Sequence, residues 1–542
     1  MPQSDVFRNP QVESGLSMSH SLNPASLEPG LSNQADNPTR EVRPWIWWIV
    51  SGLAAFGLYR LSMAPGLLWG DSGEAQLHIL TGGWLFNDQI VRSHVLYYAI
   101  ARTLRWILSA EPAVAANLTS VIAGAVTMGN VAWLLRKLCT SRVAAACGII
   151  LLAVSHTFWQ LSTSAEVVTL STALLTAEWI GVVQWLEKRQ SRWLVLSAVA
   201  NGLGLSNHNF AMLMWPVYGL VFLLRRREAK TVSWREVALV ASAWLLGAAP
   251  ILVLSIGFWR EHGSLAETAQ SLLVGRYGRH IGNLSVLLHL LGRAACYTFL
   301  NFPTPLLLLA ALGLLSYWRT GDRTLRIVLV GAAAMYAAFG ASYGVADQHA
   351  FLVPAFVLAA VFVALGLNDF CNRRGSRGFA VAAILLALLG PLAYALAPRI
   401  LTGSSLASSW LPPRIIPYRD PCIWFLRPWR NGYDGAERFA REVLEGLPPD
   451  AWLVADSTVC PPINYLQARR SLRRDVRLIS SIARQPWLQP TDEVRGREAM
   501  MNAGRLFATS DARPYLPDWL RDGSFRFDPA GYVWLIKKSG PG

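Results

Sequence analysis

Long apolar stretches separated by short polar connections dominate the chain between residues 44 and 397. The stretches 327–343 and 379–397 contain no charged residue. A helix of about 20 mainly apolar residues is long enough to cross the hydrocarbon layer of a membrane. The pattern therefore predicts a polytopic α-helical membrane protein with about 11 transmembrane helices, at 44–64, 113–135, 143–160, 165–186, 193–206, 209–224, 237–258, 302–318, 327–343, 351–367 and 379–397.

The polar connections between these stretches alternate in charge. The segment before the first span is basic, and so is every second connection: Arg40 and Arg43; Arg136, Lys137 and Arg142; Lys188, Arg189 and Arg192; Arg225, Arg226, Arg227, Lys230 and Arg235; Arg319, Arg323 and Arg326; Arg373, Arg374 and Arg377. Basic connections stay on the cytoplasmic side of a membrane. We expect a cytoplasmic N-terminus and, because the number of spans is odd, an extracytoplasmic C-terminus, in a bacterial inner (plasma) membrane.

One pair of predicted spans is interrupted. The short runs 193–206 and 209–224 meet at Ser206-Asn207-His208-Asn209. Irregular backbone at membrane depth is tolerated where it lines a cavity or is buried in protein. Two interpretations stay open, namely two short spans or one re-entrant hairpin.

The segments outside the spans differ in composition. Residues 1–42 are rich in Ser, Asn, Pro and Gln, which predicts a disordered cytoplasmic segment. Residues 43–398 make the predicted transmembrane domain, with an extracytoplasmic loop at 65–112 whose part 94–108 has the pattern of an interfacial amphipathic helix. Residues 399–542 predict a small extracytoplasmic α/β domain, with helices at 435–445 and 463–470 and strands at 451–455, 476–479 and 532–536.

The composition agrees with a membrane protein and narrows its function. Hydrophobic residues make up 53% of the chain and charged residues 15%, against roughly 25% charged residues in soluble domains. The net charge of +15 comes mostly from span ends and the C-terminal segment, so we expect no nucleic-acid partner. The cysteines show no CxxC spacing and indicate no zinc or redox site. Cys422 and Cys460 could pair if their region is extracytoplasmic.

Ionisable residues gather on the predicted outward side. Such residues close to membrane spans cost free energy and often mark function. The outward connections and span ends contain Asp71, Glu74, His78, Asp88, Glu166, His208, Asp347 and His349. The alternating topology brings all of them to the same membrane face.

The spacing of Asp71 and Glu74 is the most informative part of this set. In a helix, residues three apart share a face. One carboxylate could therefore accept a proton from a hydroxyl nucleophile while the other orients that hydroxyl or holds a metal. Alternatively, Asp71 or Ser72 caps the helix N-terminus, which spacing alone favours.

The other candidates also keep two interpretations each. Arg276 and Arg279 could clamp a phosphate or belong to a solvated loop. Glu166 follows an aromatic segment and is a site residue or a solvated acid. His208 lies in a break that faces a cavity or is a simple turn, and Asp347 is a helix cap or a site residue.

An ordered set of motifs is similar to the DUF2723 family of the GT-C glycosyltransferase superfamily, which includes a transmembrane protein O-mannosyltransferase. The segment Met63-Ala64-Pro65-Gly66-Leu67-Leu68-Trp69-Gly70-Asp71-Ser72-Gly73-Glu74 resembles the first-loop motif of that family. The segments at 156–170, 204–208 and 454–476 resemble later parts of its pattern in the same order. The resemblance covers most of residues 44 to 480.

The resemblance implies an inverting transfer of a sugar, with mannose the first candidate, from a polyprenyl-phosphate-linked donor. Asp71 matches the family acid that acts as general base, with Glu74 beside it. The acceptor would be a hydroxyl of a protein or glycolipid, and the leaving group a lipid phosphate. The substrate-binding candidates are Glu166, His208, Asp347, Arg276, Arg279, His94 and Tyr97. No metal ligand is assigned, although a divalent metal is compatible with the acids, and the implied partners are the bilayer, the lipid-linked donor and the acceptor.

One stretch departs from the family pattern. The family usually has a Pro-rich run after the acid motif, whereas residues 88–97 read Asp-Gln-Ile-Val-Arg-Ser-His-Val-Leu-Tyr, of which only Leu96-Tyr97 fits. This departure leaves the substrate of the implied transfer undetermined.

Two other functions compete with an enzyme: a lipid-linked sugar transporter or flippase, and a non-catalytic membrane assembly subunit. A transporter should have its acids near span midpoints, whereas these acids lie at outer span ends.

Overall fold

The structure is a computed structural model that describes residues 43–85, 89–229, 233–374, 377–402, 404, 414–489 and 492–539. The predicted disordered segment 1–42 lies outside the described residues, and so does Asp88.

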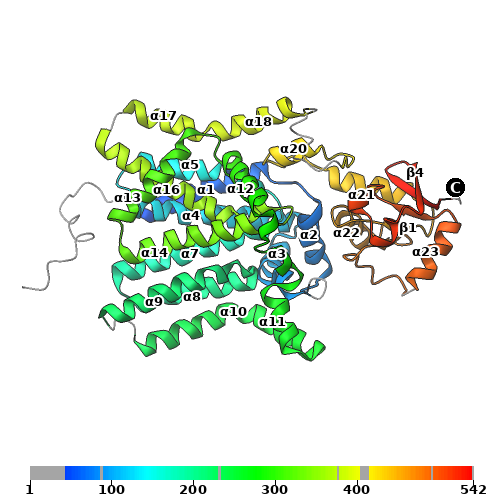
Figure 1. The fold of residues 1–542 in the computed structure, drawn as a ribbon, viewed down its shortest axis with the longest axis horizontal. Coiled ribbons are helices and arrows are strands. Elements are labelled where there is room, and N and C mark those ends of the chain that lie inside the picture. Colours follow the sequence, from blue (N-terminus) through cyan, green and yellow to red (C-terminus); the bar gives the residue numbers. More distant parts are fainter. Residues whose placement is uncertain are drawn as a thin grey trace, which may run out of the picture. The chain divides into compact units, whose positions relative to one another are not determined.

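Helices make up the chain as far as residue 401 (Figure 1). They are α1 (Pro44–Ser62), α2 (Gly70–Thr81), α3 (Val95–Leu108), α4 (Pro112–Leu138), α5 (Arg142–Ala153), α6 (His156–Ser162), α7 (Val167–Lys188), α8 (Ser191–Asn207), α9 (Trp215–Ala229), α10 (Trp234–His262), α11 (Leu265–Leu273), α12 (Leu287–Asn301), α13 (Leu308–Thr320), α14 (Arg323–Ser342), α15 (Gln348–Phe351), α16 (Val353–Arg374), α17 (Arg377–Ala387) and α18 (Leu389–Leu401). Every predicted span overlaps one of these helices or a pair of them.

The described residues contain six helical segments long and apolar enough to cross a membrane: α4, α7, α10, α14, α16 and the α17–α18 segment. The bent pairs α5–α6 (62°) and α12–α13 (118°) raise the number to eight if each is one span. The chain is thus an integral membrane protein, but the predicted count of eleven is not confirmed. One reason is that α8 and α9, with 17 and 15 residues, are short for a span.

The helices differ in how much surface they present outward. The spanning parts of α4, α7 and α16 are largely enclosed by their neighbours, whereas α10 and α17–α18 remain mostly uncovered. Close packing of α8 on α10 depends on Gly202 and Gly247, since a Cβ atom at either would collide with the backbone of the facing helix. The uncovered faces of α10 and α17–α18 are the ones that lipid would contact.

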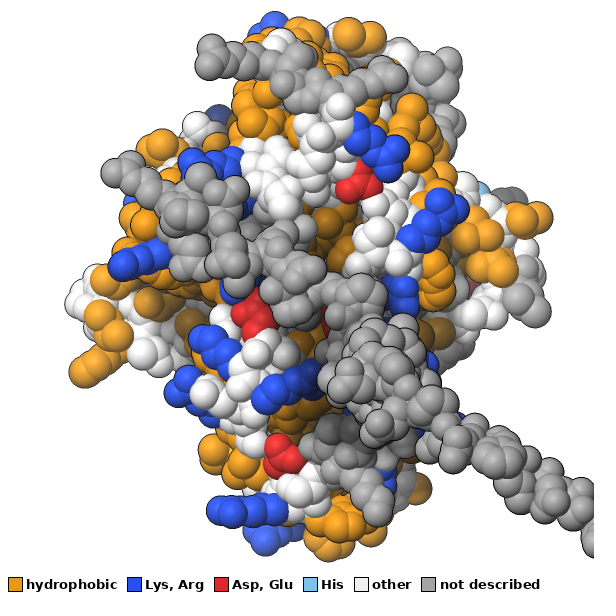
Figure 2. All heavy atoms as spheres, turned by 90° about the vertical axis from the view of Figure 1, so that its left-hand side faces the viewer, with side chains coloured by type: hydrophobic (Ala, Val, Ile, Leu, Met, Phe, Trp, Pro, Cys, Tyr) orange, Lys and Arg blue, Asp and Glu red, His pale blue; other side chains and the backbone are white. Residues whose placement is uncertain are grey.

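The basic connections lie at one end of the helical part. Figure 2 views this end from the left of Figure 1 and shows Lys and Arg side chains spread over it, with few acidic ones. Contacts tie neighbouring connections together: Lys137 pairs with Glu187 at 2.9 Å, and the Arg225 guanidinium donates to Thr324 at 2.7 Å. The basic connections, which alternate along the chain with less basic ones, thus form one basic face of the molecule.

The interruption at Ser206–Asn209 ends α8. A 3-10 helix, η2 (Asn209–Met214), follows and leads into α9. Asn207 stabilises the break, since its side-chain amide donates to Val167 O and Ser171 Oγ on α7. The polar break is therefore packed against protein, which is the condition for irregular backbone at this depth.

The C-terminal segment contains a five-stranded mixed sheet of order β2-β1-β3-β5-β4. Its elements are α20 (Pro421–Leu426), α21 (Gly435–Gly446), β1 (Trp452–Val454), α22 (Cys460–Arg470), β2 (Arg477–Ile479), α23 (Glu493–Asn502), β3 (Leu506–Ala508), β4 (Phe525–Ala530) and β5 (Val533–Lys538). Strand β1 is parallel to β2 and β3, whereas β5 is antiparallel to β3 and β4. The predicted helices and strands are present, and Cys422 and Cys460 are each buried and unpaired.

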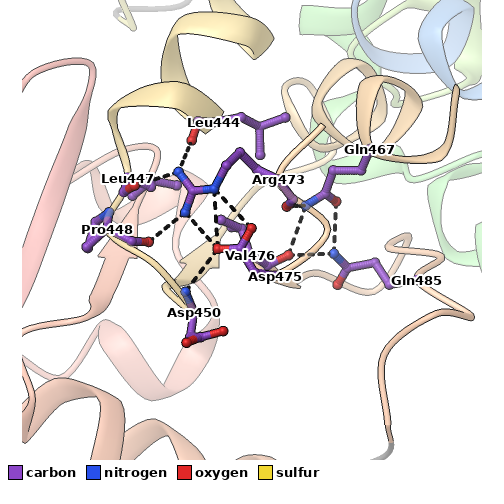
Figure 3. Close-up of polar contacts among 9 residues, drawn as sticks. All are labelled: Leu444, Leu447, Pro448, Asp450, Gln467, Arg473, Asp475, Val476 and Gln485. Carbon is purple, nitrogen blue, oxygen red and sulfur yellow. Dashed lines mark hydrogen bonds and ion pairs between the residues drawn. The ribbon is translucent and has the colours of Figure 1, made fainter. Parts of the chain in front are cut away.

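A partly buried arginine, Arg473, fixes the connection between α21 and β1 (Figure 3). The Arg473 guanidinium donates to Leu444 O at 2.8 Å, Leu447 O at 2.7 Å and Pro448 O at 2.8 Å, and it pairs with Asp475 at 2.7 Å. The last carbonyls of a helix lack intrahelical donors, so these bonds close the end of α21.

The sheet region shares one hydrophobic core with the segment between α1 and α3. Leu67, Trp69 and Leu77 pack in the same cluster as Phe439 and Ile463. The Gly70 amide donates to Thr458 O at 2.9 Å, and Trp69 Nε1 donates to Tyr433 Oη at 2.5 Å. The loop that carries Asp71 is therefore folded against the C-terminal segment, and the predicted domain boundary at residue 398 stays a prediction.

Candidate active site

A cavity of about 290 Å³ collects most of the candidate side chains. Its ionisable lining residues are Asp71, Glu74, Arg92, His94, Glu166, His208 and Asp347. Its apolar lining includes Val91, Leu213, Leu273, Val274, Ile281, Phe339 and Phe351. Residues from the first loop, the α6–α7 connection, the α8 break and the α14–α15 connection thus meet around one space.

The first turn of α2 presents two carboxyl groups to the same cation. Asp71 Oδ1 and Glu74 Oε2 each lie 3.4 Å from Arg92 Nη2. The two acids differ in environment, because the Asp71 side chain is 68% exposed and that of Glu74 only 8%. The prediction that the three-residue spacing puts both carboxyl groups on one helix face is confirmed.

The capping interpretation of this turn is wrong. Trp69 occupies the N-cap position of α2, with no side-chain cap. The Ser72 hydroxyl instead donates to Glu166 Oε1 at 2.6 Å. The side chains of Asp71 and Ser72 are therefore turned toward other parts of the site.

Burial raises the pKa of three carboxyl groups in the cavity. Burial raises the pKa of Glu74 to about 8, against the opposing effect of Arg92. Burial also raises the pKa of Glu166 to about 8, although the Ser72 hydrogen bond lowers it, and raises that of Asp347 to about 7. Near neutral pH, Glu74 and Glu166 are largely protonated and Asp347 is about half protonated, and the protonated groups can donate hydrogen bonds.

Two histidines are stacked beside the acids. The rings of His94 and His208 are 5.5 Å apart with an interplanar angle of 10°. His94 Nδ1 donates to Asn207 O at 2.8 Å, and His208 Nδ1 accepts from the Phe210 amide at 3.1 Å. Burial lowers the pKa of His94 to about 4, so its ring is neutral and its Nε2 is an acceptor. In neutral His208, Nε2 carries the proton, so the pair offers one acceptor and one donor.

Arg92 is a lining residue that the sequence did not single out. It ends the 3-10 helix η1 (Ile90–Arg92), inside the stretch that departs from the family pattern. Arg92 lies outside the helix that contains Asp71 and Glu74, so residue spacing could not predict its ion pairs with these two acids.

Three predicted residues do not line the cavity. Tyr97 is buried below it, where its hydroxyl donates to Ala116 O at 2.7 Å and lies 2.9 Å from Ser120 Oγ. Its neighbour Tyr98 lines the cavity instead. His78 is buried against the Tyr98 ring, and His349 packs on Tyr297. The Ser120 hydroxyl in turn donates to the backbone carbonyl of Glu166 at 3.0 Å. Tyr97 is therefore connected to the Glu166 backbone through Ser120.

Arg276 and Arg279 lie in a 3-10 segment, η3 (Gly275–His280), and their side chains are outside the described part of the structure. Leu273 and Val274 before this segment and Ile281 after it line the cavity. The backbone that carries both arginines is thus placed beside the cavity.

Within the described residues, no group of three His, Cys, Asp or Glu side chains is placed to hold a metal ion.

Residues 94–231 match the family described as the protein O-mannosyl-transferase TMEM260 N-terminal domain. The match confirms the resemblance to a transmembrane protein O-mannosyltransferase. It includes His94, Glu166 and His208, and it begins after the Asp71–Glu74 motif. A comparison with curated proteins gave no match.

The fold is similar to that of ArnT from Cupriavidus metallidurans. The structure of that protein bound to undecaprenyl phosphate aligns with a TM-score of 0.56 at 12% identity, covering 90% of this chain and 97% of that one. Its apo structure aligns with a TM-score of 0.57 at 13% identity, with the same coverage. Arabinofuranosyltransferase AftD from Mycobacteria aligns with a TM-score of 0.48 at 14% identity, over 92% of this chain and 40% of that one. The two ArnT alignments show that this chain and that protein share a fold.

Proposed function

We propose that the protein is a membrane glycosyltransferase that moves a sugar from a polyprenyl-phosphate-linked donor to a hydroxyl group of a protein or glycolipid. The family match over residues 94–231 and the ArnT-like fold support the reaction class. The observation that carries the proposal is a solvent-exposed carboxylate, Asp71, on the lining of a cavity whose other acids have raised pKa values.

In this proposal Asp71 is the general base. Its carboxylate takes the proton of the acceptor hydroxyl while the acceptor oxygen bonds to the anomeric carbon. The bond from that carbon to the phosphate oxygen breaks, and the electron pair leaves with the polyprenyl phosphate. Attack opposite the leaving group inverts the anomeric centre. Asp71 suits this role because it is the most exposed of the cavity acids and can reach an acceptor that arrives from solvent.

The remaining acids have a different role. Glu74, Glu166 and Asp347 have pKa values raised to about 8, 8 and 7, so a large part of each is neutral at pH 7. A neutral carboxyl group can donate a hydrogen bond to a sugar hydroxyl without repelling the nearby Asp71 charge. His94 and His208 add an acceptor and a donor. These five residues bind the sugar in this proposal.

The mixed lining of the cavity fits a donor with a polar head and an isoprenoid chain. Arg92 lies beside Asp71 and supplies a cation for the phosphate, and η3 brings Arg276 and Arg279 to the same region. Cations near the leaving phosphate stabilise the charge that develops there. The structural neighbour ArnT was solved with undecaprenyl phosphate bound, which is consistent with a lipid-phosphate donor here.

The basic face supports a proposal for the side of the membrane on which the reaction occurs. Because basic connections remain cytoplasmic, the opposite ends of the helices, with the cavity and the C-terminal sheet, are extracytoplasmic in this proposal. The protein would then act at the outer face of a bacterial inner membrane, with its N-terminus in the cytoplasm.

The test is an Asp71→Asn variant. Membranes that contain the protein are incubated with a polyprenyl-phosphate sugar, and labelled product is measured. We expect a loss of transfer of about 10²–10⁴-fold, the usual contribution of a general base, with unchanged expression and membrane insertion. Asp518→Asn is the matched control, because the Asp518 side chain is 96% exposed and lies outside the cavity.

Two results would count against the proposal. Full activity of Asp71→Asn would remove the assignment of the base while leaving the reaction in place. Absence of transfer by the wild-type protein from every lipid-linked donor tried would instead favour a transporter or a non-catalytic subunit. A glycan profile of a deletion strain would identify the acceptor class.

A further inference from the structure

A second cavity, of about 760 Å³, lies in the segment between the last helical span and the sheet. Its lining residues all lie between Ile415 and Tyr433, and none of them lines the candidate active site. Helix α20 forms part of the wall and packs on α18, at the end of the last apolar segment. The cavity is therefore close to the membrane boundary.

Arginine and aromatic side chains make this cavity electropositive. Arg419, Arg427 and Arg430 line it, and the single acid in its described lining is Asp420. The Asp420 carboxylate is already engaged, since it accepts from the Ile423 amide at 2.7 Å and caps α20. The lining thus carries three cations and one acid that is used locally.

The three guanidinium groups have no carboxylate partner among the described residues. Nε of Arg419, Arg427 and Arg430 is buried without a hydrogen-bond acceptor in each case. Arg430 is only 4% exposed, and burial lowers its pKa to about 9. A buried charge without a counterion is costly and is normally paired, so an anion bound in this cavity would stabilise the cluster.

The loop holds these side chains in place without that anion. The Arg430 guanidinium donates to Trp424 O at 2.6 Å and lies 4.2 Å from the centre of the Trp424 ring. Arg419 lies 5.2 Å from the same ring centre. Cation–π contacts and carbonyl bonds therefore fix Arg419 and Arg430 before any ligand arrives, which lowers the cost of binding.

We propose that this cavity is a second binding site, specific for a phosphate group carried by a membrane lipid headgroup. Guanidinium groups recognise phosphate with paired, charge-assisted hydrogen bonds. The lipid source is favoured because Ile415 and Ile423, which flank the cavity, are 84% and 39% exposed. Apolar side chains beside a cationic cavity at a membrane boundary can contact acyl chains while the arginines hold the headgroup. The site is independent of the proposed sugar transfer.

The test uses the purified full-length protein in detergent and native mass spectrometry with two probe lipids, phosphatidic acid and phosphatidylcholine. We expect retention of phosphatidic acid in preference to phosphatidylcholine. Arg419→Gln combined with Arg427→Gln should weaken phosphatidic acid binding by about tenfold or more, because two charge-assisted contacts are lost. Arg495→Gln is the matched control, since the Arg495 side chain is 91% exposed and remote in sequence from this cavity.

Inorganic phosphate, compared with chloride at equal ionic strength in a thermal-shift assay, distinguishes the source. Stabilisation by inorganic phosphate that is lost in the double variant supports the phosphate chemistry, with a free anion as the ligand if phosphatidic acid does not bind. The two single variants are measured as well, so that a folding defect of the double variant does not decide the outcome. Equal phosphatidic acid binding by wild type and both single variants would overturn the proposal, and so would a wild type that neither binds phosphatidic acid nor is stabilised by inorganic phosphate.

Discussion

At the scale of single residues, the cavity places one exposed acid among buried ones. Asp71 is open to solvent, whereas Glu74 and Glu166 are in surroundings that favour their neutral forms. The difference comes from burial, which penalises the charged form of a carboxyl group. Acids of the same chemical type can therefore divide the roles of base and hydrogen-bond donor.

The raised pKa of Glu166 predicts a pH-dependent stability. Its pKa is about 8 in the folded protein and about 4.3 in an unfolded chain. The folded state therefore binds more protons between these values, and the free energy of unfolding falls as the pH rises through this window. The favourable contribution is complete below about pH 4.3 and is lost as the pH rises to about 8. Thermal unfolding in detergent from pH 5 to 9 measures this dependence.

The control for that measurement is Glu166→Gln, which cannot ionise. We expect its unfolding temperature to depend less on pH than that of the wild type. Ser72→Ala should shift the loss of stability to higher pH, because the Ser72 hydrogen bond lowers the pKa of Glu166. Identical pH profiles for all three proteins would show that Glu166 keeps an ordinary pKa.

Arg92 is expected to be essential for transfer. Replacement by Gln removes the cation between Asp71 and Glu74 and leaves the phosphate without that partner. We predict a fall in kcat/KM of about 10²–10³-fold, typical for loss of one electrostatic contact to a developing charge. The pKa of Glu74 should also rise further, because Arg92 lowers it. An Arg92→Gln protein with the wild-type rate and pH profile would exclude this role.

The candidate site could be predicted in part from the sequence. Asp71, Glu74, Glu166, His208 and Asp347 were expected on one face because charge alternation fixes which helix ends share a side. The contacts of Arg92 and the burial of Tyr97 could not be predicted, because both depend on how η1 and α3 pack on other helices.

At the scale of secondary-structure elements, hydrogen bonds of individual side chains, rather than a repeating hydrophobic pattern, determine how the C-terminal segment folds. The Arg473 side chain joins the end of α21 to the turn before β1. The arginine itself has a positive φ of 46°, a conformation uncommon outside glycine. Its network of bonds outweighs that local cost.

Replacement of Arg473 by Ala should destabilise this region by about 2–4 kcal/mol, because several buried carbonyl groups lose their donor. Hydrogen exchange of the peptides that cover α21 and β1 measures the effect as faster exchange. Arg495→Ala is the control, since that side chain makes only an exposed ion pair with Asp492. Unchanged exchange in Arg473→Ala would show that the network adds no stability.

The elements missed by sequence inspection have short or irregular patterns. Strand β4 contains Pro529 at the edge of the sheet, so it gives no clear strand signal. Long apolar helices such as α4 and α7 were predicted to within a few residues, because lipid requires a long apolar run. The bends at α5–α6 and α12–α13 were not predicted, because they depend on packing around the break.

At the scale of the whole molecule, the basic face makes a prediction about topology. Fusion of alkaline phosphatase after Ser539 should give an active enzyme, because phosphatase activity requires export. A fusion within the α7–α8 connection, at Arg189, should be inactive and should fluoresce when green fluorescent protein is used instead. This follows from the positive-inside rule, and the reverse pattern would invert the proposed orientation of the cavity.

The shared core between the first outward loop and the C-terminal segment has a consequence for biosynthesis. Trp69 and its partner Tyr433 are 364 residues apart in the chain. At about 5–20 residues per second, the ribosome delivers the second partner on the order of 20–70 s after the first. In the proposed orientation, the loop that bears Asp71 therefore stays incompletely packed until the C-terminal segment has been translocated. A chaperone or protease at the membrane has this interval in which to act. In a chain that stalls before residue 433, the loop that bears Asp71 would lack its contact with Tyr433.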